Sequence, residues 1–269
     1  MTTAEEPGLY LYAILPERVA TPSLGVGIRD APLKVVTAAG LAAVVHEGQV
    51  GALTGDDADV KEWVVQHSEV VERVWGFGDT VLPATFNVIV APGDGESAAE
   101  RLCGWLTTSA ETLAARLQTL AGLVELQVEI DLDPQRVAQS DPEATQLRNS
   151  LAERPPGVRR LLQRKLDTLE RDAADRRADE LYPDYRRRLA EHCEDLSEGR
   201  RAHPPQGFVT VLNLALLARR EAVESVGSVL ATIRSEQPAA EVSFFGPWPP
   251  YSFTDALDIG TVGDRASAR

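Results

Sequence analysis

The stretch at residues 244–253, with the sequence FFGPWPPYSF, restricts its backbone more than any other part of the chain. Three of the four residues from 247 to 250 are prolines, which hold φ at about −65° and remove three N–H donors. Each residue before a proline is driven toward extended backbone, so the stretch is not expected to be helical. It is predicted to form a short, stiff, polyproline-like segment that carries aromatic rings.

The aromatic rings of this segment leave two interpretations open. Either the chain buries them on itself, or it offers them to a partner protein, and Trp248, Tyr251 and Phe253 are the candidate partner-contact or motif residues. In the first interpretation, Phe244 and Phe245 belong to a closing strand and the core, while Trp248 and Tyr251 pack on the domain. Trp248→Ala would then cost about 3–5 kcal/mol if the ring is fully buried.

The charge of the chain limits the partners that it can attract. It has 27 Lys and Arg against 41 Asp and Glu, a formal net charge of −14, so non-specific attraction to nucleic acid or to an anionic membrane is not expected. Residues 148–201 are arginine-rich and nearly neutral, whereas the remainder is strongly acidic. The two cysteines, the absence of a signal-peptide pattern and the absence of a long apolar run predict a cytoplasmic protein without a membrane span.

Periodic segments predict an α/β (α+β) fold in two domains, of which residues 1–122 form an N-terminal mixed α/β domain. Apolar runs at 9–15 and 80–90 predict strands, and runs at 33–37 and 41–46 predict a hairpin that turns near Gly40. Apolar residues at three- and four-residue steps predict one helix that starts at the acidic residues 56–59 and ends at Gly76, and another that runs from a cap at 94–97 toward Gly122.

Residues 123–258 are predicted to form a modified ferredoxin-like domain with a long charged helical insertion at 140–201. The order is β-α-β-α-β, one strand short of the usual arrangement, and Pro183 should kink or split the insertion. Residues 123–132 alternate between apolar and acidic side chains, which favours a sheet face with carboxylates in water over a cation site. The tail at 259–269 is expected to be disordered.

No catalytic, cofactor-binding or metal-binding residues are predicted. The sequence has no nucleophile elbow, phosphate loop or His-Glu-x-x-His pair, so the chain is not expected to be an enzyme. His67 lies on the apolar face of the first predicted helix, where a ligand or pH-sensing role is one interpretation. A core histidine with one satisfied hydrogen bond is favoured.

The chain resembles the gas vesicle protein F/L family over roughly residues 8–255. The resemblance rests on LYLYAIL at 9–15, GLAAVV at 40–45, the helix containing His67, TVLPATFNVIV at 80–90 and, above all, GPWPPYSF at 246–253. Residues 83–87, PATFN, depart from the sequence that this family often carries there, as do residues 155–160.

The resemblance implies a minor structural or accessory protein of gas vesicle assembly that is located at the gas vesicle. It implies protein–protein contacts with the hydrophobic shell protein and with other accessory proteins, no cofactor, and a mixed domain followed by a modified ferredoxin-like domain. A small-molecule-sensing regulatory module is the alternative function, because ferredoxin-like domains host many unrelated activities.

Overall fold

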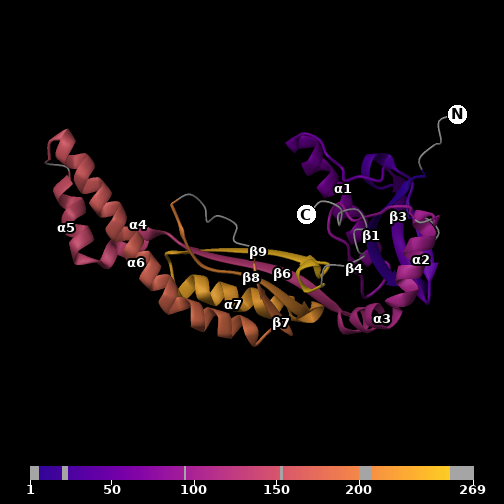
Figure 1. The fold of residues 1–269 in the computed structure, drawn as a ribbon. Helices are drawn as coiled ribbons and strands as arrows, with labels where there is room; N and C mark the ends of the chain where they lie inside the picture. Colours follow the sequence, from indigo (N-terminus) through magenta and orange to yellow (C-terminus); the bar gives the residue numbers. More distant parts are fainter. Residues whose placement is uncertain (1–5, 20–23, 94, 152–153, 200–206, 255–269) are drawn as a thin grey trace, which may run out of the picture. The chain divides into compact units, whose positions relative to one another are not determined.

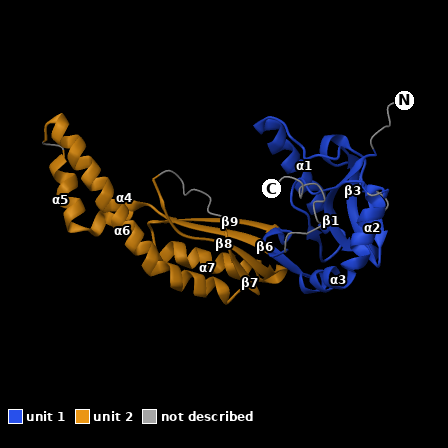
Figure 2. Ribbon diagram, in the orientation of Figure 1, with its two compact units in different colours: residues 1–124, 248–269 blue, residues 125–247 orange. Residues whose placement is uncertain are grey.

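The chain divides into two compact units, which Figure 2 draws in different colours. The computed structural model describes residues 6–19, 24–93, 95–151, 154–199 and 207–254. Unit 1 contains residues 1–124 and 248–269, and unit 2 contains residues 125–247. The predicted second domain, 123–258, differs from unit 2 at its end, because the chain from Trp248 onward groups with unit 1. The predicted disordered tail, 259–269, lies outside the described residues.

Unit 1 is built on a sheet with β1 (Gly8–Pro16) at its centre. The strand order is β2-β3-β1-β4, with β2 at Lys34–Ala38, β3 at Leu41–Gly48 and β4 at Leu82–Pro83, and β5 (Ile89–Val90) also pairs with β1. Residues 8–15 are all buried, as expected of a strand with neighbours on both sides. The predicted hairpin is confirmed: β2 and β3 are antiparallel, and Ala39 and Gly40 turn the chain with φ of 50° and 78°.

The run at 80–90, predicted as one strand, instead forms two short strands separated by a kink. β4 and β5 pair with opposite parts of β1. Pro83 removes a ladder donor, and Asn87 adopts a φ of 71°, which breaks the extended backbone between the two strands. Asn87 also exchanges hydrogen bonds with Leu53, through its side-chain oxygen at 2.9 Å and its side-chain nitrogen at 3.2 Å.

The first two helices of unit 1 begin where their capping residues predict. Helix α1 (Asp57–Trp75) follows Asp56, whose carboxylate accepts from the N–H groups of Ala58 and Asp59. Helix α2 (Ala98–Thr108) begins with a capping box between Ser97 and Glu100. The single helix predicted from the cap at 94–97 toward Gly122 is wrong, because Ser109 departs from helical backbone and helix α3 (Ala110–Thr119) starts after it.

Unit 2 contains a four-stranded sheet in the order β7-β8-β6-β9. The strands are β6 (Leu123–Leu132), β7 (Asp195–Glu198), β8 (Val209–Arg219) and β9 (Ala240–Trp248). Helices α6 (Pro156–Ala190) and α7 (Val223–Glu236) lie on one face of this sheet (Figure 1). With β7 included, the order along the chain is βαββαβ, the usual ferredoxin-like arrangement. The prediction of one missing strand is therefore wrong, because β7 lies inside the region predicted as a helical insertion.

Two acidic residues of β6 do not face water, contrary to the prediction, and Glu129 is half-buried. Glu125 and Asp131 are buried, because β6 lies between β8 and β9 rather than at an edge. Thr210 donates to the carboxylate of Asp131 at 2.7 Å, and Asn213 donates to that of Glu129 at 3.0 Å. These bonds from β8 satisfy carboxylates that the sheet removes from solvent.

A helical hairpin extends from one end of the unit 2 sheet (Figure 1). Helices α4 (Pro134–Val137) and α5 (Pro142–Ser150) pack against the first half of α6 around a small core of Ala138, Ala144 and Leu166. A half-buried Arg148 pairs with the buried Glu170 at 2.7 Å. Helix α6 runs through Pro183 without ending, so of the two predicted alternatives, a kink or a split, the split is excluded. Pro183 lies on the exposed side of α6, where water can solvate the freed carbonyl.

Candidate functional site

The proline-aromatic segment ends strand β9 and then packs into unit 1. Trp248 is the last residue of β9 and is 38% exposed, whereas Pro249 and Pro250 are buried. Tyr251 begins a short 3-10 helix, η6 (Tyr251–Phe253), which ends at the buried Phe253. The prolines therefore end the sheet as predicted, but Phe253 rather than Trp248 is the buried aromatic residue.

Helix α3 holds the end of this segment. The guanidinium group of Arg116 donates to the backbone carbonyl of Phe253. Tyr251 is also a minor cause, after burial, of the raised pKa of Tyr10. Of the three residues nominated from the sequence, Phe253 is inside unit 1, Tyr251 is half-buried and Trp248 presents part of its ring to solvent.

Phe244 and Phe245 are exposed, which corrects their predicted place in the core. They lie in β9 as predicted, but their exposed fractions are 37% and 47%. Strand β9 is the last strand in the sheet order, so its neighbours cover its side chains on one side only. Adjacent residues of a strand point to opposite faces, and the two rings therefore border both faces of this sheet edge.

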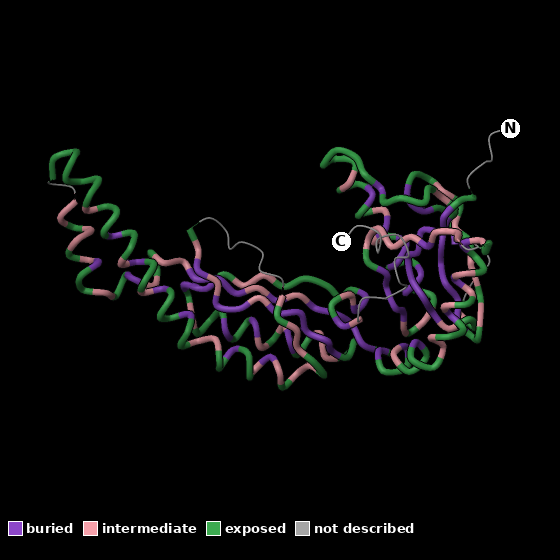
Figure 3. Tube along the Cα trace, in the orientation of Figure 1, coloured by how far each residue is buried: buried purple, intermediate pink, exposed green. Residues whose placement is uncertain are grey.

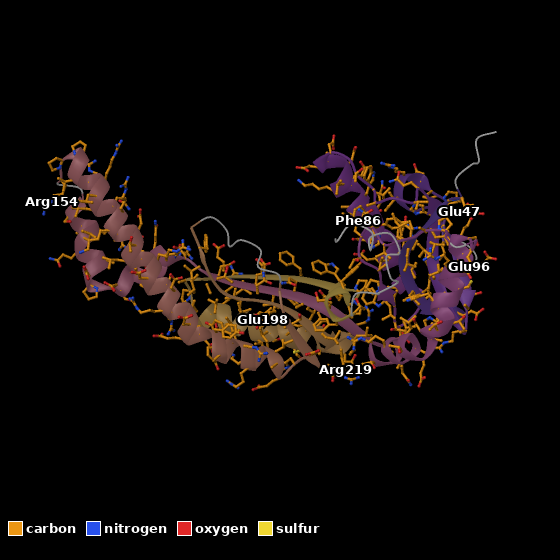
Figure 4. The ribbon with its side chains drawn as sticks, viewed as in Figure 1. Glu47, Phe86, Glu96, Arg154, Glu198 and Arg219 are labelled. Atoms are coloured by element: carbon orange, nitrogen blue, oxygen red, sulfur yellow. The ribbon has the colours of Figure 1, made fainter. Side chains whose placement is uncertain are left out.

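The interior of unit 1 contains two tyrosine–histidine pairs, which the sequence analysis did not identify. Tyr10 and Tyr12 lie two residues apart on β1, and their rings approach to 5.0 Å. His46 is the cross-strand partner of Tyr10 on β3 and stacks on its ring at 5.0 Å. His67 enters from α1, and its ring lies 5.3 Å from that of Tyr12. The ring of Phe86, labelled in Figure 4, lies edge-on to that of Tyr10, with 6.3 Å between the ring centroids.

Each tyrosine hydroxyl links a backbone N–H group to a histidine. The Asn87 N–H donates to Tyr10 Oη at 3.1 Å, and this hydroxyl lies 3.0 Å from His67 Nδ1. His67 Nε2 lies 3.0 Å from the Ala84 carbonyl, which can only accept. Nε2 therefore carries a proton, and in the neutral imidazole that burial favours, Tyr10 donates to Nδ1. Two hydrogen bonds hold this histidine, one more than predicted.

Tyr12 and His46 form the second pair, in which the tyrosine hydroxyl again connects a backbone N–H group to a histidine. The Ile28 N–H donates to Tyr12 Oη at 2.8 Å, and this hydroxyl lies 2.8 Å from His46 Nδ1. The pairing of β1 with β3 skips Tyr12, because Leu11 pairs with Val45 and Ala13 with Val44. This bulge adds a residue to β1 at the position from which Tyr12 reaches His46.

Burial keeps these four groups uncharged. It raises the pKa of Tyr10 above its ordinary value and that of Tyr12 to about 12. It also lowers the pKa of His46, and it lowers that of His67 to about 4 against a smaller opposing effect of the Ala84 carbonyl. Both ring nitrogens of the neutral His67 are occupied by hydrogen bonds within unit 1, which is the character of a structural group rather than of a catalytic base.

Lowering the pH is expected to destabilise unit 1 through His67. Between about pH 6.5 and pH 4 the unfolded chain binds a proton that the folded chain excludes, so stability falls as the pH falls through this window. The loss attributable to His67 is about 3 kcal/mol at most. Urea unfolding at several pH values should show the stability difference between wild type and His67→Leu shrinking toward pH 4. A difference independent of pH would contradict the assignment, and His192→Gln in unit 2 provides the control.

Two further features of the described residues bear on reactivity: the state of Cys193 and the grouping of possible metal ligands. Burial raises the pKa of the Cys193 thiol to about 11, with the carboxylates of Asp195 and Glu194 adding to the shift, so this sulfur is not an activated nucleophile. Within the described ranges, no group of three or more His, Cys, Asp or Glu is placed to hold a metal ion. A search of those same ranges finds no helix both long and apolar enough to cross a membrane.

Similarity to known proteins extends over nearly the whole chain. A family model described as gas vesicle synthesis protein GvpL/GvpF matches residues 8–255. Gas vesicle protein L1 of Halobacterium salinarum is 30% identical over 277 residues, covering 96% of this chain and 95% of that protein. Gas vesicle protein L of Haloferax mediterranei is 28% identical, covering 87% of this chain and 73% of that protein.

Two crystal structures share the fold. The gas vesicle protein GvpF from Anabaena sp. PCC7120 aligns with a TM-score of 0.66 at 18% identity, covering 93% of this chain and 96% of that chain. GvpF from Microcystis aeruginosa aligns with a TM-score of 0.64 at 19% identity, covering 91% and 98%. The family match spans both units, and the similarity to protein L1 extends over nearly the full length of each chain. This protein therefore belongs to the gas vesicle protein GvpL/GvpF family.

Proposed function

We propose that this protein is an accessory or minor structural protein of gas vesicle formation that acts at the gas vesicle by binding other proteins. The family match over residues 8–255 supports a role in gas vesicle formation. The family is described by vesicle synthesis rather than by a catalysed reaction. The buried Tyr–His pairs are neutral and hydrogen-bonded to each other inside unit 1, as structural groups are. Binding rather than turnover is therefore the function that the site supports best.

The aromatic edge of β9 is the proposed contact for the hydrophobic shell protein. The observation that carries this assignment is the exposure of Phe244 and Phe245 on the last strand of a sheet. Large exposed aromatic rings bind apolar partners strongly for their area, and an edge strand also offers backbone groups to an extended partner segment. An apolar protein with extended segments fits both features. Trp248 continues this exposed strand and is the motif residue best placed to contribute.

The strong net negative charge supports the same assignment. A formal charge of −14 keeps the chain dispersed while it holds an apolar partner that would otherwise aggregate. Binding through a few aromatic residues does not require charge of the opposite sign on the shell protein. Contact with other accessory proteins is also proposed, and co-purification of each pair would identify those partners.

The double variant Phe244→Ser/Phe245→Ser is expected to weaken binding of the shell protein by about 10- to 100-fold. The measurement is co-purification of the two proteins, followed by titration of the accessory protein onto immobilised shell protein. Phe77→Ser is the matched control, because Phe77 is 41% exposed but lies after α1 in unit 1. Equal binding by wild type and the β9 variant, with unchanged melting, would remove β9 as the contact.

A further inference from the structure

The two most exposed large apolar side chains among the described residues lie on different helices in surroundings of opposite charge. Leu161 on α6 is 68% exposed, and Val65 on α1 is 57% exposed. Each belongs to a helix whose other face packs against its own unit. Leaving both in water costs hydrophobic free energy, and covering one with the other would recover it.

Leu161 lies near the tip of the helical hairpin, within a run of basic residues. Residues 154–165 contain five basic residues and no acidic one, in a chain whose net charge is −14. Figure 3 shows this tip as exposed, and Figure 4 labels Arg154 there. Val158 is three residues before Leu161, and Arg164 and Lys165 are three and four residues after it, so they share its side of the helix.

The charge at this tip is only partly neutralised. Lys165 pairs with Glu143 at 3.0 Å, and both side chains are exposed. The structure has no ion pair within 4 Å for Arg160 or Arg164 among the residues that it describes. Leu161 and Val158 therefore form an apolar patch bordered by cations that are free to meet a partner's carboxylates.

Val65 occupies the corresponding position on an acidic helix face. Glu62 is three residues before it and Glu69 is four residues after it, and both are exposed. Lys61 shares this face, while Glu72 adds a further carboxylate one turn beyond Glu69. Asp56, Asp57 and Asp59 make the start of the helix acidic as well.

We propose that the hairpin tip of one copy, residues 154–165, docks on the exposed face of α1, residues 57–75, of a second copy. Leu161 and Val158 would cover Val65, while Arg160 and Arg164 would face Glu62 and Glu69. The two surfaces are complementary in apolar contact and in charge. Each has an apolar side chain at its centre, and the charged residues around the two centres are mainly of opposite sign. The inference concerns this chain alone and does not depend on the proposed contact with the shell protein.

The proposed contact joins two different surfaces, so it leaves one free surface at each end of a pair. Such a head-to-tail contact generates open chains of molecules unless the geometry closes a ring. Two helix faces bury less area than a standard stable interface, so the association is expected to be weak, with a dissociation constant of about 10–100 μM. It should weaken further between about 0.05 M and 0.5 M salt, because its border charges are exposed.

The test uses two single variants of the full-length protein, Leu161→Asp and Val65→Asp, in sedimentation velocity. Wild type is expected to show a concentration-dependent series of oligomers at low salt, and each variant alone should sediment as a monomer. The equimolar mixture should form a dimer and no larger species, because the intact tip of the Val65 variant docks on the intact α1 of the Leu161 variant. Val50→Asp is the matched control, with an exposed valine outside both surfaces, and it should associate as wild type does.

Three outcomes would overturn the proposal. Wild-type protein that remains monomeric at about 200 μM in low salt has no such contact. Association that persists in either single variant places the contact elsewhere. A mixture that stays monomeric, while each variant keeps the wild-type circular dichroism and melting temperature, excludes a head-to-tail arrangement. Because no shell protein is present, none of these results bears on shell-protein binding.

Discussion

Replacing His67 with leucine is expected to lower the free energy of unfolding of unit 1 by about 3–5 kcal/mol at neutral pH. The variant leaves the Tyr10 hydroxyl without its acceptor and the Ala84 carbonyl without its donor, both inside the core. Each orphaned polar group costs about 1–3 kcal/mol. Urea unfolding followed by tryptophan fluorescence is the measurement, because all four tryptophans of the chain belong to unit 1.

A double-mutant cycle with Tyr10→Phe tests whether this cost comes from the shared hydrogen bond. Tyr10→Phe removes the same bond from the other side and also leaves the Asn87 N–H without its acceptor. The double variant should therefore cost about 1–2 kcal/mol less than the sum of the single variants. Tyr182→Phe is the matched control, since that hydroxyl bonds to Glu198 at 2.7 Å in unit 2. Additive costs would show that Tyr10 and His67 do not act through one bond.

Phe253→Ala is expected to cost about 3–5 kcal/mol, more than any other single change in the proline-aromatic segment. The ring of Phe253 is buried in unit 1, and the variant would leave a cavity there. Trp248→Ala should cost only about 1–2 kcal/mol, because the indole is 38% exposed and loses less on removal. This order reverses the one that a fully buried Trp248 would have produced.

Thermal and urea unfolding by circular dichroism compare these two variants without relying on the tryptophan signal that one of them removes. Phe245→Ala serves as the control, because its ring is 47% exposed on β9. A Trp248 variant that loses as much stability as the Phe253 variant would mean that the indole packs more tightly than its exposure indicates. A Phe253 variant of nearly wild-type stability would mean that the segment contributes little to unit 1.

The strands and helices with a complete periodic pattern could be predicted from the sequence. LYLYAIL, the Gly40 hairpin and the helix after Asp56 all appear near their predicted bounds. Strand β7 could not be predicted, because its four residues are mostly polar and Leu196 continued the spacing of Leu189 and Cys193. Its strand conformation depends on pairing with β8, which is a contact between distant parts of the chain.

The position of β6 inside the sheet could not be predicted from its own residues either. Alternating carboxylates at 123–132 indicate a solvated face when a strand is read alone. The structure places β6 between two strands, and Thr210 and Asn213 supply donors from β8. Neither donor is near β6 in the sequence. Local patterns therefore predicted the strand correctly and its environment incorrectly.

The buried Tyr–His pairs left only a weak signal in the sequence. Tyr10 and Tyr12 alternate with leucines, which placed both tyrosines on one side of a buried strand. A buried phenol needs a partner for its hydroxyl, so two such residues together predict polar groups nearby. The partners lie 34 and 57 residues away in the sequence, and only the packing of β3 and α1 on β1 identifies them as His46 and His67.

The division of unit 1 between the two ends of the chain affects how the protein is made. Its strands and helices up to residue 124 leave the ribosome first, but Phe253 and the prolines before it are translated only after the whole of unit 2. Until then, the apolar surface that receives Phe253 beside Arg116 stays uncovered on the nascent chain. A polypeptide released before codon 248 would carry this surface permanently. Chaperones and proteases that recognise exposed apolar surface could thus distinguish incomplete chains from finished ones.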